Sequence, residues 1–435
     1  MNARRTYLWA AVLPLVFSLG CASAGKRLEQ GMEAEAGGDY HTAAYRYIQA
    51  LEKDRSLAEA RDGLLSAWES ALAQGTAFAR ERMSEGDPVG AAGEYRQLDA
   101  LRRDARDVGV SLPTTDRYAP ERRAALDGAI AELMDRGDGL RRDGRWNDAR
   151  SAFRRVVDEM DPVDSQRQAS LEAQALVLLE WAESDAEQRR HRAAFQRAGE
   201  VLEVSPDVPQ DLASAALRLQ EETLSAGLRV VAVFPVGSTP DFGRASLTDL
   251  QSQLSDFLET EYWQRPPLFV AVAEPARVRQ IARRVSPPGT PLRPQLVVSE
   301  AGADFGVLVE LVELEGEERN VRAMRRAART RSGADTAYTV EDGRIGYTMV
   351  AEVTLFDERG IRVESFRVRN EGSEDFRRAR YDGSPEELEL GRGDRLLFNP
   401  GEERRQRGLL QSSLIGDLGR EIAEGVFERV IRRIP

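Results

Sequence analysis

Two hydrophobic patterns divide the chain near residue 229. From Gly25 to about Leu228, apolar residues recur at helical spacing in a segment rich in Ala, Leu, Glu and Arg. At Arg229 the pattern changes to the short apolar run VVAVFPV, whose β-branched residues indicate a buried strand. We therefore predict α-helices over residues 21–228 and a mixed α/β domain over residues 229–435.

A short phrase recurs within the helical half. A turn glycine is followed by small and aromatic residues at helical spacing, and in two of the three copies another glycine lies seven residues upstream. The phrase resembles the tetratricopeptide repeat, a helix–turn–helix unit whose copies stack into a solenoid and leave one face open to protein partners. The turns are irregularly spaced, so an irregular solenoid is expected, with repeat-packing residues Gly31, Gly38, Tyr40, Ala43, Tyr47, Ala50, Gly86, Ala91, Tyr95, Gly137, Gly144, Trp146, Ala149 and Phe153. Ordinary helical core packing would give the same pattern.

The second half alternates strands and helices. The expected elements are strands over 230–236, 268–272 and 305–314, helices over 247–258, 276–285 and 296–301, a hairpin of 346–356 and 361–369, and a closing amphipathic helix over 410–430. The hairpin is expected to turn at Glu358-Arg359-Gly360. A charged segment over 315–342 and a polar insertion near 370–408 lie between these elements.

This order of elements, with the phrases VVAVFPV and EAGADFGVLVELVE, resembles a domain of periplasmic lipoproteins. That group includes curli-secretion channel subunits and the lipoprotein activators of penicillin-binding proteins. The resemblance implies a compact sandwich of sheet and helices, with Gly302-Ala303-Asp304 forming the turn before the third strand.

The N-terminus has the features of a secretory signal. Arg4 and Arg5 precede an apolar segment that is too short to span a bilayer, and the segment ends just before Cys21, the only cysteine of the chain. The sequence FSLGC resembles the lipobox of bacterial lipoproteins. That resemblance implies that residues 1–20 are a cleaved signal peptide, that Cys21 is acylated, and that Ala22 directs the protein to the outer membrane.

Other roles for Cys21 are weaker. A disulfide within the chain would need a second thiol, which the sequence lacks, whereas a buried free thiol stays open as an alternative.

Charge and composition narrow the class of partner. The formal net charge is −12, and loss of Arg4 and Arg5 with the signal peptide would take it to −14. An acidic chain is not expected to bind nucleic acid, which favours a basic surface. No apolar run after the signal is long enough for a transmembrane helix.

The sequence offers little chemistry for catalysis. It contains two histidines, His41 and His191, and none of the common metal-binding, phosphate-binding or nucleophile motifs. We therefore expect no enzyme activity, no cofactor and no metal.

A local excess of arginine stands out within the charged segment. It could contact anionic lipid headgroups or an acidic protein face. The alternative is a solvated helix or loop whose charge is balanced by neighbouring glutamates. The residues concerned are Arg319, Arg322, Arg325 and Arg326, with Glu315, Glu317 and Glu318 nearby.

These observations lead to one functional hypothesis. We expect an outer-membrane lipoprotein, anchored at Cys21 and facing the periplasm, that acts as an interaction scaffold or accessory factor for envelope assembly or secretion. Its partners would be the membrane and envelope proteins. The alternative is a structural subunit that forms homo-oligomers through the C-terminal α/β domain.

Overall fold

The structure, a computed structural model, describes residues 23–238, 244–287 and 290–435. The predicted signal peptide and Cys21 lie outside the described residues. Within the described ranges, no helix has the length and apolar character needed to cross a membrane. The chain folds into two compact units, one of Met1–Trp181 with Glu200–Ala213 and one of Ala182–Gly199 with Ser214–Pro435.

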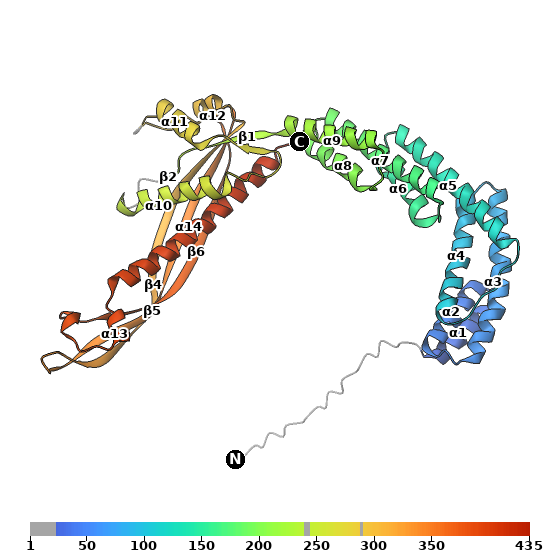
Figure 1. Cartoon of the computed structure of the whole chain (residues 1–435), viewed down its shortest axis with the longest axis horizontal. Coiled ribbons are helices and arrows are strands. Elements are labelled where there is room, and N and C mark those ends of the chain that lie inside the picture. The colour runs from blue at the N-terminus through green and yellow to red at the C-terminus, as the bar shows by residue number, and fades with distance from the viewer. Residues whose placement is uncertain (1–22, 239–243, 288–289) are drawn as a thin grey trace, which may run out of the picture. The chain divides into compact units, whose positions relative to one another are not determined.

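The helical half forms successive antiparallel helix pairs (Figure 1). The helices are α1 (Ala24–Ala36), α2 (Tyr40–Lys53), α3 (Ala58–Ser84), α4 (Pro88–Asp107), α5 (Tyr118–Arg142), α6 (Trp146–Glu159), α7 (Asp164–Glu187), α8 (His191–Glu203) and α9 (Gln210–Gly227). The prediction of a helical solenoid followed by an α/β domain is confirmed.

The recurring glycines occupy the turns between paired helices. Gly38, Gly86 and Gly144 have φ angles of 77°, 79° and 71°, a left-handed conformation that costs glycine little. The aspartate that follows in the first two copies caps the next helix. Asp39 accepts a hydrogen bond from the Thr42 amide at 3.1 Å, and Asp87 accepts one from the Gly90 amide at 2.7 Å. The repeated Gly-Asp pair therefore ends one helix and begins the next.

In the α1–α2 and α5–α6 pairs, an aromatic residue of the second helix packs against glycines of neighbouring helices. A Cβ atom on Gly31 of α1 would lie 2.6 Å from the Tyr47 ring, and one on Gly63 of α3 would lie 2.7 Å from it. A Cβ atom on Gly137 of α5 would likewise lie 2.5 Å from the Phe153 ring. The helices approach this closely because the glycines lack side chains.

The second half is built on a mixed sheet with strand order β3-β1-β4-β5-β6, in which β2 also pairs with β4. Parallel pairs join β1 to β3 and β4, whereas β4, β5 and β6 are antiparallel. The strands are β1 (Arg229–Val233), β2 (Gly237–Ser238), β3 (Val270–Val272), β4 (Phe305–Arg329), β5 (Asp335–Asp357) and β6 (Arg362–Arg380). The predicted turn at Glu358-Arg359-Gly360 is confirmed: Gly360 has a φ of 73°, and the Ile361 carbonyl accepts a hydrogen bond from the Asp357 amide.

Helices cover both faces of the sheet near β1. On one face, α14 runs along the long β4–β6 ribbon (Figure 1), and Leu418, Ile422 and Val426 of α14 pack with Val309 and Val353 of the sheet. On the other face, α11 and α12 pack against Ala232 and Phe234. The helices of this half are α10 (Arg244–Phe257), α11 (Pro275–Val285), α12 (Pro294–Ala301), α13 (Arg392–Leu396) and α14 (Pro400–Ile431), with a π-helical turn over Leu258–Tyr262 and a 3₁₀ turn over Pro385–Glu387.

Strands β4, β5 and β6 are longer than predicted, and the predicted structure of the two charged segments was wrong. Residues 315–329, expected to form a loop or solvated helix, continue β4, and residues 370–380, expected to begin a polar insertion, continue β6. Charged residues occupy these extensions and form cross-strand ion pairs, such as Arg344–Asp375 at 2.9 Å and Arg377–Asp342 at 3.0 Å. Because both faces carry polar residues there, the hydrophobic alternation that reveals a strand is missing.

The Gly302-Ala303-Asp304 turn positions the start of β4. Gly302 ends α12 in the left-handed conformation, with a φ of 67°. The Asp304 carboxylate accepts a hydrogen bond from the Val230 amide of β1 at 2.7 Å, and the Asp304 amide donates to the Val230 carbonyl at 2.8 Å. The turn thus joins β1 to β4 at the point where they begin to pair.

We expect Asp304→Ala to lower the free energy of unfolding by about 1–3 kcal/mol, because it leaves a part-buried amide of β1 without its partner. Urea denaturation of the variant and the wild type measures the change. Asp382→Ala, on an exposed turn, is the matched control and should change stability by less than about 0.5 kcal/mol.

Candidate functional site

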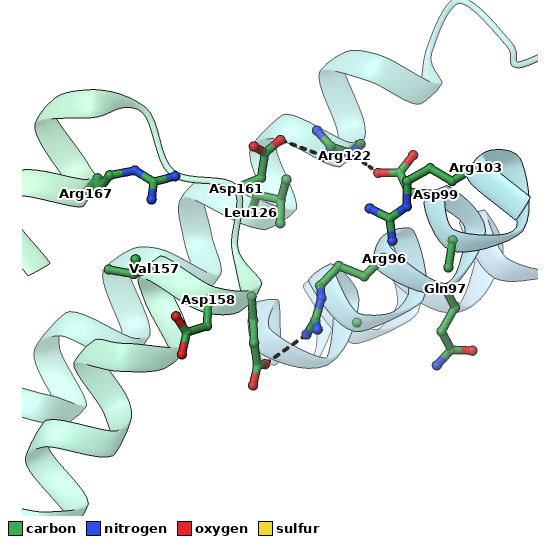
Figure 2. Close-up of a pocket in the computed structure, with 13 residues that line it drawn as sticks. Arg96, Gln97, Asp99, Arg103, Arg122, Leu126, Val157, Asp158, Asp161 and Arg167 are labelled. Atoms are coloured by element: carbon green, nitrogen blue, oxygen red, sulfur yellow. Dashed lines mark hydrogen bonds and ion pairs between the residues drawn. The ribbon is translucent and has the colours of Figure 1, made fainter.

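A polar hollow of about 760 Å³ lies between α4, α5 and α6 and the loop before α7 (Figure 2). Its lining combines arginine and carboxylate side chains with a small apolar floor. The lining residues are Gly93, Arg96, Gln97, Asp99, Ala100, Arg103, Arg122, Leu126, Val157, Asp158, Glu159, Asp161 and Arg167. All of these residues belong to the compact unit of Met1–Trp181 with Glu200–Ala213.

Two of the arginines are held by ion pairs across the hollow. Arg96 of α4 pairs with Glu159 of α6 at 2.9 Å, and Arg122 of α5 pairs with Asp161 at 3.0 Å and with Asp99 of α4. Burial opposes the charge of Arg122, but hydrogen bonds to Asp161 and Asp99 outweigh it, so the pKa of Arg122 lies above its ordinary value. These two guanidinium groups are fixed parts of the wall.

Asp99 is also held by Tyr118, which lies outside the lining of the hollow. The Tyr118 hydroxyl donates to Asp99 at 2.9 Å, and the Tyr118 ring packs edge-on against Tyr95 with ring centroids 5.4 Å apart. Burial and the neighbouring Asp99 carboxylate raise the pKa of the Tyr118 hydroxyl, so it stays a neutral donor. Asp99 is thereby oriented by both Tyr118 and Arg122.

Two other arginines that line the hollow differ from Arg96 and Arg122 in their lack of ion pairs among the described residues. Arg103 of α4 and Arg167 of α7 are exposed, and in the described part of the chain neither side chain has an ion pair or hydrogen bond. Figure 2 shows their guanidinium groups extending into the hollow from opposite sides. They are available to a ligand, and guanidinium groups bind carboxylates and phosphates well.

A smaller hollow of about 370 Å³ lies on the other side of α4. Gln97 lines both hollows, and Phe78 of α3 lines the smaller one with 46% of its surface exposed. An exposed aromatic side chain beside a polar hollow is a common anchor in protein interfaces.

In the part of the chain that the structure describes, the side chains that most often hold metals or transfer protons do not come together. Among the described residues, no group of three His, Cys, Asp or Glu side chains could hold a metal ion. His41 lines the smaller hollow and His191 lies near Gly227, so the histidines do not meet. Burial, with Arg229 and Arg189 nearby, lowers the pKa of His191.

The residues singled out from the repeat phrase lie mostly in the helical core. Ala43, Tyr47, Ala50, Ala91, Tyr95, Ala149 and Phe153 are buried, and Tyr40 and Trp146 are half-buried. None of the repeat-packing residues lines the larger hollow, although Gly38 lines the smaller one. Sequence reasoning missed the hollow because its arginines come from separate helices and follow no repeat.

The arginine cluster does not form a single patch. Arg319 pairs with Glu317 at 2.8 Å and Arg326 with Asp394 of α13 at 3.1 Å. Successive side chains of β4 point to opposite faces of the sheet. Arg322 and Arg326, level with Asp342 and Tyr338 of β5, share one face with Arg319, whereas Arg325, level with Thr339, lies on the other face. Arg322 and Arg325 have no ion pair within the described residues.

Comparison with known proteins gives no family. No protein-family model matches the chain, and no curated protein matches it. Among solved structures, a hypothetical protein from Chlamydia trachomatis is similar at 18% identity, over 47% of this chain and 99% of that one, with a TM-score of 0.25. A TM-score this low supports no inference about fold or function.

Proposed function

We propose that this protein is a non-enzymatic scaffold of the bacterial envelope, which binds a partner protein through the arginine-lined hollow between α4 and α6. The observation that carries the proposal is the pair Arg103 and Arg167, which extend into the hollow without partners of their own among the described residues. The wall around them is polar, and its other two arginines, Arg96 and Arg122, are held by ion pairs. Such a site favours binding of an acidic segment over catalysis.

The proposed location is the periplasmic face of the outer membrane. It is supported by the signal-like N-terminus, by the lipobox-like sequence before Cys21, and by Ala22 after it. More than one acyl chain is needed for stable anchoring, and lipidation of the lipobox type would supply this. The tetratricopeptide-like phrase supports protein binding as the role of the anchored chain.

The intact mass of the chain isolated from membranes tests the anchor. We expect the chain to begin at Cys21 and to carry added acyl mass. Cys21→Ser is expected to leave the protein unacylated and to release it from the membrane fraction. A full-length chain that starts at Met1 and carries a free thiol would contradict the anchor.

Charge reversal tests the hollow. We expect Arg103→Glu with Arg167→Glu to reduce recovery of co-purified envelope proteins by about tenfold or more, because each charge-assisted contact becomes a repulsion. Quantitative mass spectrometry after mild crosslinking of intact cells measures this recovery.

A matched control separates local contacts from total charge. Arg106→Glu with Arg142→Glu makes the same charge change at exposed positions of α4 and α5 outside the hollow. This control should leave recovery within about twofold of the wild type. Equal losses in both double variants would show that net charge, and not the hollow, governs binding.

A further inference from the structure

Within the described ranges, β4 has a long edge that no other strand pairs with. β1 and β2 pair with β4 only as far as Leu311, and the next contact on that side is the bridge from Thr330 to Leu388. Among the described residues, no strand pairs with this edge between 313 and 328. At about 3.3 Å per residue the open edge is roughly 50 Å long. An exposed edge of this length is a template for another strand.

Charges along this edge change sign at its centre. Glu313, Glu315 and Glu317 come first, and Arg319 and Arg322 follow. The register with β5 sets Glu315, Glu317, Arg319 and Arg322 opposite Thr348, Gly346, Arg344 and Asp342. Alternate residues of a strand share a face, so these four side chains lie on one face of the sheet. The bulge at Asn320, whose φ is 57°, keeps Arg322 on that face.

Several groups along the edge are exposed and have no partner elsewhere in the described chain. Glu315 and Arg322 have no ion pair within the described residues, and Glu317 and Arg319, 65% and 69% exposed, pair with each other. Val321 and Met324 expose 44% and 48% of their surfaces beside them. A second strand would cover these apolar side chains and meet the charges.

We propose that this edge pairs, antiparallel, with the β4 edge of a second copy of the chain. Glu318, level with Ile345 of β5, would lie at the two-fold axis and face its own copy, and within each chain its carboxylate is paired with Arg378 at 2.8 Å and Arg407 at 2.7 Å. Distances along the edge are counted by the β5 residue that each β4 residue pairs with. Counted from Ile345 in this way, Glu317 and Arg319 lie one residue to either side of the axis, and Glu315 and Arg322 lie three residues to either side. In the antiparallel pair, Glu317 of one protomer faces Arg319 of its partner, and Glu315 faces Arg322. Each contact occurs twice, as in any two-fold interface.

A head-to-tail arrangement fits the charges less well. β6 runs parallel to β4 and forms the opposite edge of the ribbon. The register places Glu371 level with Glu315, and Arg377 level with Arg322. Pairing β6 of one copy with β4 of the next at equal height would set these like charges together, which is destabilising, while Arg319 would meet Asp375 and Glu313 would meet Arg369. The two-fold pair sets Glu315, Glu317, Arg319 and Arg322 each opposite a charge of the other sign, so for these four residues it fits better.

Two charge-reversed variants of the full chain test the proposal. Glu315→Arg with Glu317→Arg makes the four side chains at 315, 317, 319 and 322 all basic, and Arg319→Glu with Arg322→Glu makes these four all acidic. Sedimentation equilibrium in nonionic detergent, corrected for bound detergent, gives the mass of each variant alone and of their equimolar mixture. Glu132→Arg with Asp135→Arg, at exposed positions of α5, is the matched charge control.

We expect the wild type and the control to have twice the mass of one chain. Each edge variant should raise the dimer dissociation constant by at least about tenfold, because like charges then face each other. The mixture should restore the dimer, since a basic edge meets an acidic one, and this recovery excludes misfolding as the cause of the loss. A monomeric wild type, edge variants that stay dimeric, or a mixture that stays monomeric would each overturn the proposal.

Discussion

Replacing both Gly31 and Gly63 by valine is expected to lower the free energy of unfolding of α1–α3 by about 2–5 kcal/mol. The Tyr47 ring lies between these glycines, and a Cβ atom on either one would come within 2.7 Å of it. The ring cannot move away easily, because Tyr47 is 1% exposed and its hydroxyl donates to Glu35 at 2.6 Å. Extra side-chain volume must therefore separate the helices.

Hydrogen-exchange mass spectrometry of α1–α3 peptides measures the effect where it arises. Gly139→Val is the control, because it adds the same side chain to a helix glycine that has no neighbouring atom within 4 Å of its Cβ position. It should leave exchange in α1–α3 unchanged. Protection of α1–α3 that survives in the double variant would show that Tyr47 does not hold these helices together.

A second large effect is expected at the turn between α7 and α8. Asp185 is 1% exposed at its side chain and pairs with both Arg190 and Arg197. We expect Arg190→Met with Arg197→Met to lower the free energy of unfolding by about 3–5 kcal/mol, because the carboxylate stays buried without a positive partner. Thermal unfolding followed by circular dichroism measures the loss.

A third substitution tests whether the stability lost in the double variant comes from the buried charge of Asp185 or from lost packing. Adding Asp185→Asn to the double variant removes the uncompensated charge and should recover most of the stability. Lowering the pH should also partly stabilise the double variant. A protonated Asp185 side chain carries no charge, so its burial without a positive partner costs less free energy. If Asp185→Asn gives no recovery, the arginines stabilise this turn by packing and not by charge.

Local signals predicted the helical half well. The Gly-Asp turns follow from the left-handed preference of Gly38 and Gly86 and the capping by Asp39 and Asp87, all within a few residues of sequence. Gly63 was missed because it contacts Tyr47 from the neighbouring hairpin. Nothing in its own surroundings in the sequence marks that contact.

Long-range pairing explains the larger failures. The ends of β4 and β6 are stabilised by cross-strand pairs such as Arg344–Asp375, whose members are far apart in the sequence. Arg96, Arg122 and Arg167 likewise reach one hollow from three helices. One sequence shows which residues are charged but not which of them meet.

Site-specific photo-crosslinking in living cells tests the scaffold hypothesis most directly. A benzophenone amino acid at Gln97, which lines both hollows, is compared with the same probe at Arg142, outside them. We expect the probe at Gln97 to capture a defined envelope protein that the probe at Arg142 does not, and Arg103→Glu with Arg167→Glu to abolish that product. If both positions capture the same proteins, or if the product persists in the charge-reversed chain, partner binding in the hollow is contradicted.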